Sequence, residues 1–374
     1  MNFEIIGGQH RESLMKRLLF GLMGLFLSFS GFSQEAEELP KRKMSWSAFP
    51  ALASQPETGF QFGASGGFTW SDPDTTKAFS RPSSLTPFFL YTVRNQIISG
   101  LTLDYFFRDG KNLQFNPRFF LFPDRFFGIG NDTDPDLFET YTHRFFQVRG
   151  QYSIPVSEKL FYGIFFDIQD SHLQELETGG FLETGELDGS NGGFQAGAGP
   201  AIRLDSRDNT IYPTSGYFVN FRTLFSYIGD FSYSNLTLDA RRYFGWNDGR
   251  DVLAIQAFGS FNAGKIPFYK LPQLGGDAAL RGITNASVYR DDQMMYSQVE
   301  YRRYLFWIVG ATAFVGVGDV APTLGDFRLG DFKYAGGMGL RFQVVKDERL
   351  NIRFDYGLAR GNQSAFYVSI LEAF

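Results

Sequence analysis

Apolar and polar residues alternate along most of the chain with a period of two. The alternation is clearest from Leu350 to Ala359, where every second residue from Leu350 to Leu358 is apolar and the residues between include Arg353 and Asp355. Because successive side chains of a strand point to opposite faces, this pattern predicts strands with one apolar and one polar face. The segments 101–107 and 236–244 repeat it, with Arg242 as an exception on the apolar face.

Segments of this kind, separated by Gly, Pro, Asn and Asp clusters, predict about sixteen strands. We expect them at 46–54, 59–70, 85–94, 96–108, 112–122, 141–153, 159–171, 193–204, 216–228, 230–245, 251–263, 293–305, 308–320, 332–345, 349–359 and 364–374. The even count and the spacing predict an all-β fold, a 16-stranded antiparallel transmembrane β-barrel of the bacterial outer membrane.

The lengths of the connections predict an orientation for this barrel. Long connections near 123–140, 172–192, 264–292 and 321–331 mostly alternate with short ones after the fourth strand. Barrels place long loops outside the cell and short turns in the periplasm, so both termini are expected in the periplasm. The connections 71–84 and 205–215 are long for periplasmic turns and depart from this rule.

Composition narrows the class of protein further. The chain has 44 Phe, 18 Tyr and 4 Trp with 42 Gly, no Cys and a net charge of −5. The absence of Cys excludes a disulfide scaffold, and the acidic, unclustered charge argues against a nucleic-acid partner. Polar and charged residues opposite the apolar face suit a lumen, whereas a soluble β-sandwich stays open as the alternative.

The N-terminal region is typical of an exported protein. Lys16 and Arg17 precede an apolar run from 18 to 32, and small residues lie before Gln34. The run is short for a membrane-spanning helix, so a signal peptide is predicted at 1–33, with a single membrane anchor as the alternative. Met15 is a candidate for the true start. A short periplasmic segment is then expected at 34–45, and the barrel at 46–374.

The last strand is expected to end on an aromatic residue that faces lipid. Phe366, Val368, Ile370 and Phe374 share one face of this strand, with Glu372 as the exception. A terminal aromatic on an amphipathic closing strand resembles the sorting signal of outer-membrane barrels, so Phe374 is the predicted signal residue.

Several short motifs in the second half of the chain resemble one family. In chain order they are Asp205-Ser206-Arg207-Asp208 with Pro213 and Gly216, Leu280-Arg281-Gly282-Ile283, Gln298 to Arg302, Phe314 to Gly318, Gly336 to Phe342, and Asp355-Tyr356-Gly357. Together with the terminal Phe they resemble the BamA/TamA superfamily of outer-membrane assembly and translocation proteins, also called the bacterial surface antigen family. The resemblance is strongest over 200–374.

The resemblance implies that the long extracellular loop folds back into the lumen. The Leu280 to Ile283 tetrad would place Arg281 against acidic and aromatic residues of the strands that follow, with Glu300 as the matching acid. Gly282 would let the backbone turn behind the arginine. Asp205, Arg207, Asp208, Pro213 and Gly216 would form a periplasmic turn.

Two departures from the family pattern affect these expectations. The family usually carries an acid where this chain has Gly316, and Asp319 is an auxiliary candidate that points to the opposite face. We therefore expect the lock to rest on Glu300 alone and to be weak. Family members also carry periplasmic POTRA domains or a patatin-like lipase, for which 34–45 leaves no room.

The function implied is insertion or translocation at the outer membrane, through a weak seam between the first and last strands. A passive channel or a structural docking barrel is the alternative. Gly63 to Gly67 matches a nucleophile-elbow pattern at Ser65, but it lies within a strand, so no enzyme is expected. The expected partners are outer-membrane lipids, periplasmic or lipoprotein partners and unfolded client proteins. No cofactor, metal, nucleic acid or small-molecule substrate is inferred.

Overall fold

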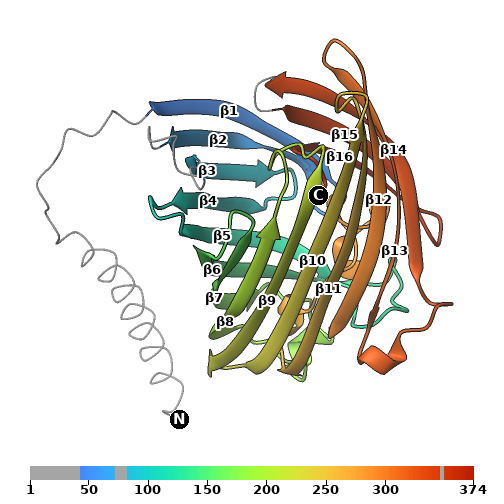
Figure 1. The fold of residues 1–374 in the computed structure, drawn as a ribbon. Coiled ribbons are helices and arrows are strands. Elements are labelled where there is room, and N and C mark those ends of the chain that lie inside the picture. Colours follow the sequence, from blue (N-terminus) through green and yellow to red (C-terminus); the bar gives the residue numbers. More distant parts are fainter. Residues whose placement is uncertain (1–42, 72–81, 346–348) are drawn as a thin grey trace, which may run out of the picture. The chain divides into compact units, whose positions relative to one another are not determined.

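The computed structural model describes residues 43–71, 82–345 and 349–374, which form a closed antiparallel β-barrel. The predicted signal peptide at 1–33, the candidate start Met15 and most of the segment 34–45 lie outside the described residues. The strands follow one another around the barrel in chain order, and β16 returns to β1 (Figure 1). The predicted fold class is confirmed.

The sixteen strands correspond one to one with the predicted segments. They are β1 (Lys43–Gln55), β2 (Gly59–Ser71), β3 (Ser83–Thr92), β4 (Ile97–Phe106), β5 (Asn112–Phe126), β6 (Glu139–Pro155), β7 (Leu160–Gln174), β8 (Gly193–Asp205), β9 (Gly216–Gly229), β10 (Ser232–Trp246), β11 (Asp251–Lys265), β12 (Gln293–Phe306), β13 (Val309–Ala321), β14 (Lys333–Val345), β15 (Leu350–Ala359) and β16 (Gln363–Ile370). Two strand boundaries differ from the predicted ones. β1 begins at Lys43, inside the segment expected to precede the barrel, and β16 ends at Ile370 rather than at the last residue.

The alternation of the sequence is also the division between the two faces of the barrel. Outward side chains such as Ile164, Phe225, Val315 and Phe366 are apolar and exposed, as contact with lipid requires. The lumen side carries buried polar residues, including Gln147, Gln195, Gln256 and Gln298. Within the described residues, no helix is long and apolar enough to cross a membrane.

The connection between β11 and β12, residues 266–292, folds into the barrel, and we call it the lumen loop. It contains two short 3-10 turns, η2 (Phe268–Lys270) and η3 (Ala286–Val288). Its apolar side chains Leu274, Leu280, Ile283 and Val288 are almost completely buried among residues of the barrel wall. The loop therefore fills part of the lumen with an apolar cluster rather than leaving a water-filled pore.

Candidate functional site: the lumen lock and the seam

Arg281 lies at the centre of the lumen loop and contacts two acidic residues of the wall. Its Nη2 donates to Glu300 on β12, and its Nη1 donates to Asp355 Oδ2 on β15 at 2.6 Å. The guanidinium also stacks on Phe314 of β13, 3.6 Å from the ring centroid. One planar fork thus joins three strands, a geometry that suits arginine and not lysine. We call Arg281, Glu300 and Asp355 the lock.

The expectation that the lock rests on Glu300 alone is wrong. Asp355 supplies a second carboxylate from β15, two strands beyond the position that Gly316 occupies. Sequence reasoning missed this role, although the alternation had already placed Asp355 on the polar face of its strand. The alternation predicts which face of its own strand a residue occupies. It does not predict which strands contact the same loop in the lumen.

Glycines of the surrounding strands make room for the lock. A Cβ on Gly339 would lie 1.9 Å from Asp355 Oδ1, and one on Gly357 would lie 2.3 Å from the carbonyl oxygen of Arg281. Gly282 has φ of +127°, and a Cβ there would come within 2.7 Å of the backbone of Leu358. Gly339 of β14 and Gly357 of β15 are therefore required by the close packing around the lock.

Three further arginines surround the lock and balance its charge. Arg302 donates to Glu300 at 2.6 Å, and Arg341 and Arg353 donate to Asp355 at 2.6 and 3.1 Å. The acids Glu372 and Asp277 complete the cluster, since each accepts from one of these arginines at 2.8 Å. Four arginines thus face four carboxylates, so the buried charges are paired as an enclosed site requires.

The tetrad is also held to the last strand by hydrogen bonds to its backbone. The N–H of Gly282 donates to the hydroxyl of Tyr367 at 3.2 Å, and that hydroxyl donates to the carbonyl of Ile283 at 3.1 Å. Leu280, with φ of 39°, is buried in the space that Gly318 leaves open. Gln363 accepts from the N–H of Thr284 at 3.0 Å. Every residue of the tetrad is therefore buried against the wall.

Asp319 does not assist the lock. It is fully buried near the end of β13, where Asn131 donates to it at 3.4 Å and Lys333 lies 4.0 Å away. No contact between Asp319 and Arg281 is present among the described residues. The auxiliary role considered for Asp319 is therefore not supported by the geometry.

The end of the chain lies in the lumen rather than on the lipid face. The backbone turns at Leu371, which has φ of 75°, and Phe374 is buried with Tyr243 and Ala254. Arg302 donates to the carbonyl oxygen of Phe374 at 2.8 Å. The expectation that Phe374 faces lipid at the end of the last strand is thus wrong. The sequence feature that indicated this turn is Glu372, an acid at a position that the alternation assigns to the apolar face. Because the strand ends before Glu372, this acid lies in the lumen and pairs with Arg341.

The seam between β1 and β16 is the weakest junction of the barrel. The pairing joins a single pair of residues, Ser54 and Val368. In contrast, β1 and β2 pair continuously from Lys43 and Ser71 to Gln55 and Gly59. Most of the free edge of β1 therefore has no strand partner among the described residues.

Comparison with known proteins identifies the family. The sequence model of the Omp85 superfamily domain matches residues 91–374. The chain belongs to the Omp85 superfamily. A search of curated protein sequences finds no match to this chain. The resemblance to the BamA/TamA superfamily is confirmed.

Solved structures of two kinds resemble this Omp85 barrel. BamA from Haemophilus ducreyi lacking POTRA domains 1–3 is 15% identical with a TM-score of 0.61, over 88% of this chain and 70% of that chain. CdiB from Acinetobacter baumannii is 12% identical with a TM-score of 0.57, over 91% of this chain and 60% of that chain. CdiB from Escherichia coli is 10% identical with a TM-score of 0.52, over 89% and 63%. At these identities the likeness shows the fold, and this chain spans less than two thirds of the CdiB chains.

The β8–β9 connection of the Omp85 barrel is an ordered turn at the end opposite the lumen loop. Arg207 forms two hydrogen bonds of 3.0 Å with the carboxylate of Asp205. Asp208 accepts from the N–H and hydroxyl of Thr214 and from Arg349 in the β14–β15 turn. Pro213 is buried, and a Cβ on Gly216 would lie 2.2 Å from the carbonyl oxygen of Ser206. These five predicted residues form one turn, which makes contact across the mouth of the barrel.

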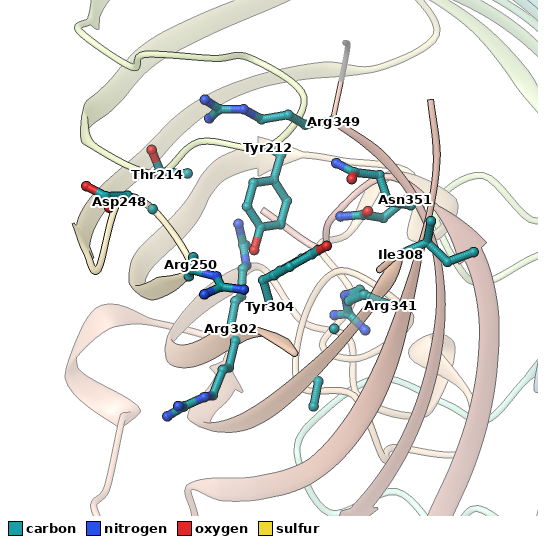
Figure 2. A pocket seen from close by; sticks show the side chains of 15 residues that line it. Tyr212, Thr214, Asp248, Arg250, Arg302, Tyr304, Ile308, Arg341, Arg349 and Asn351 are labelled. Carbon is teal, nitrogen blue, oxygen red and sulfur yellow. The ribbon is translucent and has the colours of Figure 1, made fainter. Parts of the chain in front are cut away.

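A cavity of about 320 Å³ lies at this mouth, next to the lock. Figure 2 shows Arg250, Arg302, Arg341 and Arg349 around Tyr212. Arg302 and Arg341 are the arginines already paired with the acids of the lock, and Arg349 is paired with Asp208. The mouth of the Omp85 barrel is therefore lined by charges that are largely compensated.

Proposed function

We propose that this outer-membrane barrel inserts or translocates proteins at the seam between β1 and β16. The single observation that carries the proposal is the seam itself, where one pair joins strands that elsewhere pair along their length. An unpaired strand edge presents N–H and C=O groups that can pair with an incoming strand. The membership of the Omp85 superfamily supports the proposal.

The lumen loop gives the seam a second support that is independent of strand pairing. Ser369 and Tyr367 of β16 bond to the loop, and Ser369 donates to Asp277 at 2.9 Å. On the other side of the seam, Glu57 in the β1–β2 turn accepts from the N–H of Ala286 at 2.8 Å. Side chains that contact the loop thus keep both strands in place, and a client strand would compete with few backbone bonds.

A disulfide across the seam tests the proposal. The chain has no Cys, so Ser54→Cys with Val368→Cys introduces one defined pair at residues that are direct partners. Leu52→Cys with Phe62→Cys is the matched control, because it joins direct partners across the β1–β2 junction. The assay is the rate at which proteoliposomes containing the protein fold a urea-denatured outer-membrane barrel.

We expect the oxidised seam variant to fold the client no faster than empty liposomes and to recover on reduction. The control should be active in both states. Full activity of the oxidised seam variant would refute insertion through this junction.

The alternative of a passive channel is tested by planar-bilayer conductance. The buried apolar cluster of the lumen loop favours a closed lumen, so we expect no stable conductance from the unmodified barrel.

We further propose that segment 1–33 directs export, that periplasmic or lipoprotein partners and unfolded clients bind the barrel, and that the protein is not an enzyme. Co-purification from native membranes tests the partner proposal.

A further inference from the structure

A second cavity lies between the barrel wall and the lumen loop, away from the lock. Its volume is about 240 Å³, and we call it the basic pocket. Arg149 of β6 and Arg222 of β9 line it from the wall, and Lys270 lines it from the lumen loop. Neutral polar groups of β10 and β11 also line the pocket, namely Asn235, Thr237, Ser260 and Asn262.

The positive charges of this region are not balanced. Asp167 is the acid that lines the pocket, and it is shared by Arg149 at 2.8 Å and Lys270 at 3.2 Å. The nearby Asp239 is already paired with Arg241 at 2.6 Å. This differs from the cluster around the lock, where four arginines face four carboxylates.

Two arginines of the region have no counter-ion of their own. Neither Arg222 nor Arg118, whose charge repels that of Arg149, forms an ion pair within the described parts of the chain. The Nε of each has no hydrogen-bond partner there. Arg222 instead stacks on the ring of Phe165, 4.8 Å from its centroid, and Arg149 lies 5.9 Å from the same ring. Three cations and one carboxylate therefore line the pocket, and Arg118 adds a fourth positive charge near Arg149.

Like charges held together in an enclosed space repel each other and attract an anion. Unsatisfied guanidinium donors in fixed positions favour an oxyanion, because phosphate accepts two parallel N–H bonds from arginine. The pocket can be reached from solvent, since 44% of the Arg149 side chain is exposed. Its size lies slightly below the usual range for ligand pockets, which suits a small anionic group.

We propose that the basic pocket binds a phosphate group, with Arg222 and Arg149 as its direct ligands and Arg118 adding positive potential. The phosphate belongs either to a small soluble phosphate ester or to a lipid headgroup. Lys270 links the site to the lumen loop, so a bound phosphate would join the loop to the β6–β9 wall. The proposal does not depend on the activity at the seam.

The test measures phosphate binding to the full-length barrel in zwitterionic detergent, by calorimetry at constant ionic strength with chloride as the reference anion. We expect saturable binding of inorganic phosphate that chloride does not reproduce. Arg222→Gln should weaken binding about tenfold, because it removes a charge-assisted hydrogen bond. Arg144→Gln is the matched control, since Arg144 is exposed on the same strand as Arg149 and should leave binding unchanged.

Asp167→Asn provides a prediction of opposite sign. It removes the acid that Arg149 and Lys270 share, so phosphate should bind several-fold more tightly, an effect that misfolding does not produce. Heat-modifiable gel mobility checks that each variant is folded. Competition by dihexanoyl phosphatidylglycerol would identify a lipid headgroup as the source, whereas phosphate binding without that competition would identify a soluble ester. Equal binding of phosphate and chloride, or unchanged binding by Arg222→Gln, would overturn the proposal.

Discussion

Replacement of Arg281 by alanine removes the centre of the lock. The side chain is 1% exposed and makes hydrogen bonds to Glu300 and Asp355 as well as the contact with Phe314. A hydrogen bond to a charged group contributes about 1.5–3 kcal/mol. Loss of one partner of a buried ion pair costs about 3–5 kcal/mol when the other is left uncompensated.

Neither acid of the lock is left uncompensated by this change. Glu300 keeps Arg302 at 2.6 Å, and Asp355 keeps Arg341 at 2.6 Å. We therefore place the loss at the lower end of that range, about 3 kcal/mol of the free energy that holds the lumen loop in the barrel. At about 1.4 kcal/mol for each factor of ten, the undocked population should rise roughly a hundredfold.

Proteinase K cleavage of the lumen loop measures this population, because the rate follows the open fraction when opening and closing are faster than cleavage. Trypsin is unsuitable, since the substitution itself removes a trypsin site. Arg281→Lys keeps the charge but loses the fork and should cleave at an intermediate rate. Arg328→Ala, an exposed arginine of the β13–β14 connection, is the control. If Arg281→Ala were cleaved at the wild-type rate with unchanged thermal unfolding, the lock would be incidental to loop docking.

Three further substitutions test other contacts of the loop. Gly339→Ala should weaken docking of the lumen loop by about 1–3 kcal/mol, because the added Cβ clashes with Asp355. Gly336→Ala, whose added Cβ would have its nearest neighbour at 3.2 Å, should have a smaller effect in the same proteolysis assay. Tyr367→Phe leaves two buried peptide groups of the loop without a partner and should destabilise the barrel by about 1–3 kcal/mol in thermal unfolding. Burial raises the pKa of the Glu57 carboxyl from 4.5 to about 7, so its neutral form favours docking. The stabilisation of the docked loop by Glu57 is complete below pH 4.5 and is lost as pH rises through 7, and it amounts to about 3 kcal/mol at most. Cleavage of the lumen loop should therefore accelerate over that pH range in the wild type but not in Glu57→Gln.

The parts of the structure that were predicted correctly from the sequence are those set by local alternation. A period of two places Arg353 and Asp355 on the lumen face whatever the neighbouring strands are, and it locates all sixteen strands. The pairing of Arg281 with Asp355 could not be predicted in this way, because the two are 74 residues apart and meet only when the barrel closes. The inward turn at Leu371 depends on one backbone angle. The sequence indicated it only through Glu372, a charged residue at a position that the alternation assigns to the apolar face.

The weakness of the seam and the strength of the lock are two parts of one arrangement. β16 has a single backbone pair with β1, yet its inward side chains Gln363, Tyr367 and Ser369 all bond to the lumen loop. The position of β16 against β1 is therefore determined largely through the loop, and the loop in turn is held by Arg281. Any force that separates the seam must also break these side-chain bonds, and any change that releases Arg281 lowers the resistance of the seam without touching β1. A seam that opens more readily in Arg281→Ala, while the β1–β2 junction does not, follows from the contacts alone.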